Sequence, residues 1–258
     1  MKTAVKNTLL AIAVAIVIAG ICVIHSLSER ELSQNTCQGL AVEFLDDYNF
    51  VTEEDVKKAL DTQFGRYLGM ALDSINLYRI ENILDLQSAV LKSEAYLGKD
   101  GNLNISITQR EPVVRFQKGE TGFYADERGF IFPLQDNFTS LVPIVDGEVP
   151  LFNPKDFKGS PKTEKEANWV NAIIEMVNYM NNSNIWNENI SQISVSEEGD
   201  LILVPREGNE RFIFGAPEDF GGKFRKIEKY YQYIRPLKED GYYSTVNVKY
   251  KGQIICRK

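Results

Sequence analysis

The strongest hydrophobic pattern in the chain is an apolar run near its N-terminus. Residues 9–24 contain no polar side chain, and the mainly apolar segment extends to about 20 residues, which is enough for a helix to cross a bilayer. Lys2 and Lys6 precede it, and an excess of basic residues in a short leading segment predicts that the N-terminus stays inside. We expect a short cytoplasmic tail over residues 1–7, a transmembrane helix over residues 8–27 and a polar linker over residues 28–38.

A cleaved signal peptide is the alternative interpretation of this run. Its apolar region should be shorter, and a cleavage site of small residues should follow it. Here the run continues past Gly20 into Val23 and Ile24, and no A-x-A sequence follows. A lipoprotein signal would need a small residue before its cysteine, whereas Ile21 precedes Cys22. We therefore prefer a single-pass anchor, with the rest of the chain outside the cytoplasm.

Beyond the linker, the pattern predicts a small β-α-α-β-β module. Residues 40–44 resemble a first strand, and Thr52 and Asp55 have the spacing of a capping box at the start of a helix. A second helix is expected over residues 78–86. The Asp100-Gly101 pair then lies between two segments that read as the strands of a β-hairpin.

The remainder of the chain has the pattern of a β-rich domain. Most strand candidates are short apolar or alternating segments bounded by turn residues, and two longer segments have apolar residues at helical spacing. The expected strands cover residues 123–133 as two strands around a turn, 141–147, 190–196, 200–205, 210–215 and 242–250, and the expected helices cover residues 163–180 and 220–234. Residues 251–257 are expected to continue the last strand past Gly252 and to stay open to another chain.

Together these elements predict an α+β fold with three parts. An N-terminal transmembrane helix is followed by the β-α-α-β-β module over residues 39–115 and by a β-rich domain with two or more amphipathic helices over residues 116–258. The boundary follows the sequence QREPV, residues 109–113, after which the chain becomes β-rich. Hydrophobic residues make up 43% of the chain and charged residues 25%, which is a globular composition.

Charge and motif content narrow the function classes. The net charge of −7 argues against nucleic acid as the main partner, because phosphate binding needs a basic face. The only histidine, His25, lies at the expected membrane edge, which excludes a His-based triad or a His-rich metal site from the exported part. Carboxylate pairs such as Asp46-Asp47 lie at turns or helix starts, where solvation or capping is the simpler role. We therefore predict no enzyme activity, no cofactor, no metal and no small-molecule substrate.

The chain has three cysteines and no CxxC sequence. Cys22 lies in the apolar run, Cys37 just beyond it and Cys256 at the far end. A disulfide between Cys37 and Cys256 is one interpretation, and three unpaired thiols are the other.

The order of these features resembles the FtsQ/DivIB family of bacterial cell-division proteins. In that family a short anchor precedes a POTRA (polypeptide-transport-associated) module, an R-x-P-V junction and a β-rich C-terminal domain, and the similarity covers nearly the whole chain. The matching segments are FVTEEDVKKAL (50–60), GNLNISITQREPV (101–113), YADERGFIFP (124–133), FIFG…KFRKIEKYY (212–231) and VNVKYKGQIICR (246–257).

The resemblance implies a non-enzymatic scaffold in the bacterial inner membrane at the division septum. Its C-terminal part would lie in the periplasm, bind the single-pass division proteins FtsB and FtsL, and help to control the septal peptidoglycan synthase complex. The resemblance also implies that the edge of the C-terminal domain receives a strand from the FtsB-like partner, because an exposed sheet edge presents unpaired N–H and C=O groups.

We expect seven residues to form the partner surface. Five lie in the last strand segment, where a core position for the aromatic ring of Tyr250 is the alternative. Two lie on the last helix, where they could meet an acidic partner segment or form a solvated face. The candidates are Lys249, Tyr250, Gly252, Gln253 and Ile255 near the C-terminus, and Lys223 and Lys226 on the helix.

Two other functions remain as alternatives. One is a different POTRA-bearing export or assembly factor, although that class usually carries several POTRA units or a β-barrel. The other is a membrane-anchored cell-wall enzyme, which would need a convergent polar site in a deep pocket.

Overall fold

The computed structural model describes residues 14, 16–23, 36–151, 157–187, 189–239 and 241–258. Among these residues, no helix is both long and apolar enough to cross a membrane. Residues 14 and 16–23 of the expected span are helical, whereas the rest of that span, the expected tail and most of the linker lie outside the described residues. The chain divides into two compact units, Met1–Gln109 and Arg110–Lys258.

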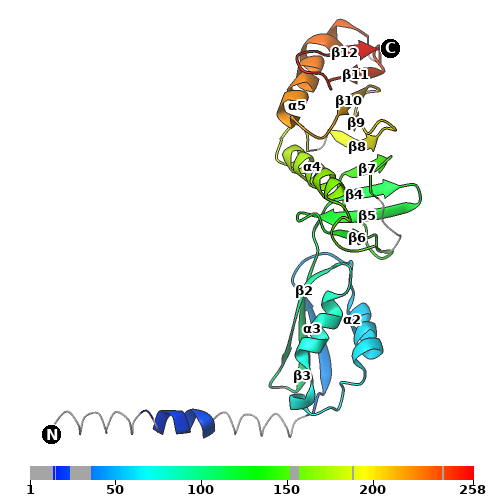
Figure 1. Ribbon diagram of the computed structural model, residues 1–258. Coiled ribbons are helices and arrows are strands. Elements are labelled where there is room, and N and C mark those ends of the chain that lie inside the picture. Colours follow the sequence, from blue (N-terminus) through cyan, green and yellow to red (C-terminus); the bar gives the residue numbers. More distant parts are fainter. Residues whose placement is uncertain (1–13, 15, 24–35, 152–156, 188, 240) are drawn as a thin grey trace, which may run out of the picture. The chain divides into compact units, whose positions relative to one another are not determined.

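Over residues 36–109, the first unit contains a three-stranded sheet and two α-helices (Figure 1). Strand β1 (Gly39–Phe44) runs parallel to β3 (Asn102–Gln109), and β2 (Val90–Leu97) runs antiparallel to β3. Helices α2 (Glu53–Ala59) and α3 (Leu77–Asp85) lie between β1 and β2 in the sequence. The strand order is β1-β3-β2, and the β-α-α-β-β prediction is confirmed.

Local sequence signals explain both helices of this unit. The Thr52 hydroxyl accepts the N–H of Asp55, and the Asp55 carboxylate accepts the N–H of Thr52 at 3.0 Å, so the capping box is present. α2 continues into a π-helical turn, η1 (Leu60–Phe64), and a 3₁₀ turn, η2 (Leu72–Ser74), precedes α3. The core residues of the unit come from alternate positions of β3 and from one stripe of each helix: Val56, Leu60, Ile80, Leu84, Leu103, Ile105 and Ile107.

The second unit is built on a nine-stranded sheet. Its strands are β4 (Pro112–Lys118), β5 (Thr121–Asp126), β6 (Ile131–Pro133), β7 (Ile144–Gly147), β8 (Ile190–Val195), β9 (Leu201–Pro205), β10 (Arg211–Gly215), β11 (Thr245–Asn247) and β12 (Ile255–Arg257). They lie in the order β12-β11-β10-β9-β8-β7-β4-β5-β6. The helical segments are α4 (Glu164–Asn181), α5 (Phe220–Lys229), η3 (Tyr230–Ile234) and η4 (Arg235–Leu237).

Helices α4 and α5 cover one face of this sheet (Figure 1). α4 starts at the capping box of Thr163 and Glu166. One continuous core joins these helices to alternate residues of the strands, and at least 20 of its side chains come from those strands and helices. Because side chains alternate across a strand, the residues between them form a helix-free face.

Two expectations about this unit need correction. The alternating segment of β4 was not predicted, and the expected boundary at residue 115 falls inside it. β4 pairs with β5 and β7 of the larger sheet, so the contacts assign residues 110–115 to the second unit. Pro112 fits this position because proline is tolerated at the first residue of a strand.

The last predicted strand is also shorter than expected. Of residues 242–250, only Thr245–Asn247 form β11, and the chain then turns near Gly252, whose φ is +75°. It returns as β12 antiparallel to β11. Residues 251–257 are therefore the second arm of a hairpin rather than a continuation of the same strand.

A candidate partner-binding edge at the C-terminus

The β11–β12 hairpin forms one end of the nine-stranded sheet. Val246 and Val248 are fully buried beneath the helices, and Ile254 and Cys256 are partly buried against the same core. β11 pairs on one side with β10 and on the other with β12. In the part of the chain that the structure describes, no strand pairs with the outer side of β12.

The hydrogen-bond alternation shows which main-chain groups of β12 are open. The N–H of Val248 donates to the carbonyl of Ile213 in β10, so Val246 and Val248 face β10, whereas the N–H of Ser244 donates to the carbonyl of Arg257 in β12. Thr245 and Asn247 therefore face β12, opposite Arg257 and Ile255. The N–H and C=O groups of Cys256 between them point away from β11. Cys256 thus supplies the central donor and acceptor of the open edge.

Two lysines fix the position of the hairpin. Lys226 on α5 donates from Nζ to the carbonyls of Val248 and Tyr250, the second at 2.7 Å. Burial lowers the pKa of the Lys226 ammonium. Lys249 forms an ion pair with Asp200 at 2.7 Å, at the start of β9. These contacts hold the first part of the loop that leads from β11 into β12.

Lys223 is the one expected contact residue that does not reach the surface. Its side chain is 4% exposed, and Nζ donates to the carbonyl of Ala216 at 2.7 Å. The same ammonium lies 4.9 Å from the centre of the Phe214 ring, and burial lowers its pKa. The expectation that Lys223 meets a partner is wrong for this conformation, because its charge is already used inside the unit. The spacing of apolar residues along the helix could not predict the burial of Lys223, because the stem of a lysine can lie along an apolar surface.

The remaining candidates lie together around the hairpin. Tyr250 is 48% exposed and is not a core aromatic. Gly252 and Gln253 are exposed in the loop, and Ile255 is half-buried on the first position of β12. A Cβ at Gly252 would meet no atom within 4 Å, so its positive φ, rather than crowding, explains the glycine. The sequence predicted a strand in this segment, but it predicted neither the hairpin nor the position of its open backbone groups.

A basic aromatic cluster at the far end of β12 was missed. The ring of Tyr242 has Lys258 Nζ at 4.2 Å from its centre and Lys238 Nζ at 5.0 Å. A hydrogen bond with Lys258, followed by the charge of that lysine, lowers the pKa of Tyr242. The strand expected over residues 242–250 gave no indication of these contacts. Lys251, Arg257 and Lys258, all within the last eight residues of the chain, were the available signal.

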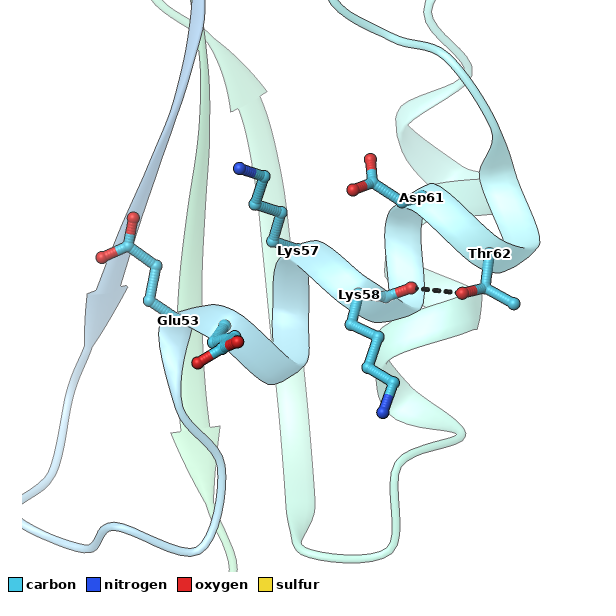
Figure 2. Close-up of a pocket in the computed structure, with 6 residues that line it drawn as sticks. Glu53, Lys57, Lys58, Asp61 and Thr62 are labelled. Carbon is cyan, nitrogen blue, oxygen red and sulfur yellow. Dashed lines mark hydrogen bonds between the residues drawn. The ribbon is translucent and has the colours of Figure 1, made fainter.

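A surface hollow lies on the first unit, and its lining residues have no catalytic arrangement. Figure 2 shows its side chains extending from α2 and the start of η1. The lining residues are Glu53, Glu54, Lys57, Lys58, Asp61 and Thr62, all exposed. The hydrogen bond drawn there, from the Thr62 hydroxyl to the Lys58 carbonyl at 2.6 Å, stays within the helical segment. The described residues contain no group of three His, Cys, Asp or Glu side chains that could hold a metal ion.

All three cysteines lie in the described residues and none is in a disulfide. Cys37 is buried in the first unit and Cys256 is partly buried in the second. The structure therefore agrees with three unpaired thiols rather than with a Cys37–Cys256 bond.

Comparison with known proteins agrees with the two-unit organisation. The family FtsQ/DivIB, C-terminal related, matches residues 111–257, which is more than half of the chain. The POTRA-like domain matches residues 35–108. No curated protein matches the chain. The chain therefore belongs to the FtsQ/DivIB family, with a POTRA-like domain before the C-terminal related domain.

Proposed function

We propose that this protein is a non-enzymatic scaffold of the bacterial division complex that holds a partner strand along β12. The open outer edge of β12 is the observation that supports this proposal most directly. A partner strand there would accept the N–H of Cys256 and donate to its carbonyl, which is the usual geometry of strand addition. The family suggests that the partner is FtsB-like, with an FtsL-like protein bound to it.

The short length of β12 limits what main-chain bonds can supply. Each hydrogen bond contributes a net of about 1 kcal/mol, so a three-residue edge needs side-chain contacts for stable capture. Tyr250 offers an exposed ring beside the loop, and Arg257 is exposed on the last strand. Lys238 and Lys258 add positive charge at the far end. This arrangement favours a partner strand flanked by acidic residues.

The proposed location follows from the family and the apolar N-terminal run. The chain would be anchored in the inner membrane at the septum, with the POTRA-like domain and the C-terminal domain in the periplasm. By holding FtsB-like and FtsL-like proteins it would help to control the septal peptidoglycan synthases. An export factor or a cell-wall enzyme is less well supported, because the FtsQ/DivIB, C-terminal related match over residues 111–257 favours the division role.

A pair of matched variants tests the scaffold and its edge together. Cys256→Pro removes the outward N–H, while Cys256→Ala keeps it and makes a similar change in the core. In cells depleted of the native protein, we expect filaments that the alanine variant rescues and the proline variant does not. Both variants should show the circular dichroism and thermal transition of the parent chain.

Two outcomes would contradict parts of the proposal. Normal septation after depletion would rule out the division role. Full rescue by Cys256→Pro, with unchanged co-purification of two small single-pass membrane proteins, would place partner binding elsewhere. The alanine variant makes the second result interpretable, because it separates loss of the thiol from loss of the N–H.

A further inference from the structure

The three-stranded sheet of the POTRA-like unit also has an edge, at β2. β2 pairs with β3 on one side only, and its residues alternate between facing β3 and facing outward. The N–H groups of Ser93 and Ala95 belong to the outward set, because both donate to side chains of α3 rather than to β3. An unprotected edge of this kind accepts strands from other molecules.

Two carboxylates of α3 accept hydrogen bonds from these outward N–H groups. The N–H of Ser93 donates to the Asp85 carboxylate at 2.7 Å, and the N–H of Ala95 donates to the Glu81 carboxylate at 2.8 Å. The Ser93 hydroxyl adds a second bond to Asp85, also at 2.7 Å, and one to the Glu81 carbonyl at 3.2 Å. Each carboxylate therefore holds the place that a carbonyl of an added strand would take.

The spacing of the two acids matches the spacing of the two amides. Residues four apart on a helix are separated by about 6 Å along its axis. Residues two apart on an antiparallel strand are separated by about 6.8 Å. α3 packs directly against β2 (Figure 1), so Glu81 and Asp85 reach Ala95 and Ser93 in antiparallel register. Two successive turns of the helix thus cover two successive outward amides.

The side chains of β2 indicate what would bind the edge if it were open. Lys92 and Glu94 flank Ser93 and form an ion pair with each other within the chain, and both side chains are 63% exposed. In an antiparallel pair of two β2 strands centred on Ser93, each Lys92 would lie opposite the Glu94 of the other copy. Opposite charges directly across a strand pair are favourable, so the strand is complementary to itself.

We propose that β2 is a masked self-pairing edge, and that Glu81 and Asp85 keep it from pairing with a second copy of this chain. This mask is independent of the proposed use of β12. It leaves the β2 edge of the POTRA-like unit unable to add a strand while α3 is in place. Recruitment through this unit would then use its other surfaces or would require displacement of the two carboxylates.

Sedimentation velocity of the full-length chain in detergent tests the proposal. We expect the parent to be monomeric and Glu81→Ala/Asp85→Ala to form dimers as its concentration rises. Glu81→Gln/Asp85→Asn keeps carbonyl oxygens at both positions and should stay monomeric. Adding Lys92→Glu to the opened variant should return it to the monomer, because Glu would then face Glu across the pair.

Amide hydrogen exchange in the parent chain provides a test that does not depend on a variant that folds. The amides of Ser93 and Ala95 should exchange slowly although they lie on an outer edge, and both should exchange faster in the alanine double variant. Rapid exchange in the parent would overturn the mask. An alanine double variant that stays folded but does not associate more than the parent, or dimers that survive Lys92→Glu, would overturn the self-pairing edge.

Discussion

Tyr230 shows how burial in the second unit makes stability depend on pH. Its side chain is 2% exposed and lies edge-on to Phe212 at 5.6 Å between ring centres. Burial, and then the charge of Glu210, raises its pKa to about 12. The unfolded chain releases this proton near pH 10 and the folded chain keeps it. The stabilising contribution is therefore complete below pH 10 and is lost as pH rises from 10 to about 12.

We expect Tyr230→Phe to reduce this alkaline loss of stability. One such group gives a slope of about 1.4 kcal/mol per pH unit in that range, and the phenylalanine variant lacks it. Urea unfolding at several pH values between 9 and 12 measures the slope. Burial also raises the pKa of Tyr231, so part of the slope should remain. Tyr233→Phe, at a 60% exposed tyrosine, is the control, and an equal effect of both changes would contradict the argument.

At the residue scale, the sequence predicted contacts that depend on near neighbours. The capping box of Thr52 and Asp55 could be identified because both partners lie within one helical turn. The roles of Lys223 and Lys226 could not, because their acceptors at Ala216, Val248 and Tyr250 depend on where α5 packs. The hydrogen bonds of Glu81 and Asp85 were missed for the same reason, although the spacing of four residues was visible.

At the element scale, the hairpin shows that the alternation of apolar residues does not predict where a strand ends. Val246 and Val248 alternate as a strand should, and the alternation continues through Tyr250, although β11 ends at Asn247. The signal for the turn was Gly252, which was taken as a bend within one strand. Register and direction are set by pairing with β10, a strand more than 30 residues earlier in the sequence.

The hairpin should depend on Lys226 more than on the rest of the helix surface. Lys226→Met keeps the length of the side chain and removes the two bonds to the carbonyls of Val248 and Tyr250. We expect faster amide exchange in residues 248–257 by roughly tenfold, equivalent to about 1.4 kcal/mol, and weaker partner capture. Lys229→Met, at an exposed lysine on the same helix, should change neither. Equal exchange in the two variants would show that the lysine does not hold the hairpin.

At the scale of the whole molecule, the sequence predicted most strands but not their order. In the nine-stranded sheet, β4 lies between β5 and β7, and β7 lies beside β8. The β4–β7 and β7–β8 pairs are parallel and join segments that are distant in the sequence. No local pattern specifies such pairs. The division into a POTRA-like unit and a β-rich unit was predictable because it follows the change from mixed helices and strands to repeated strands. The exact boundary was not, because β4 begins only two residues after Arg110.

The distribution of charge over the whole molecule leads to a last prediction. The chain has a net charge of −7, which would repel an acidic partner at long range, whereas the residues around β12 are basic. Lys251→Glu/Arg257→Glu reverses two exposed charges at that edge and takes the net charge from −7 to −11. Lys99→Glu/Lys165→Glu makes the same change in net charge at exposed sites elsewhere.

If local charge steers the partner, the first pair should slow association by roughly tenfold at low salt and the second should have a much smaller effect. The difference should disappear near 1 M salt, where the screening length is about 3 Å. Stopped-flow association rates with the purified partner measure both, and equal slowing by the two pairs would show that net charge, rather than the edge, controls the encounter.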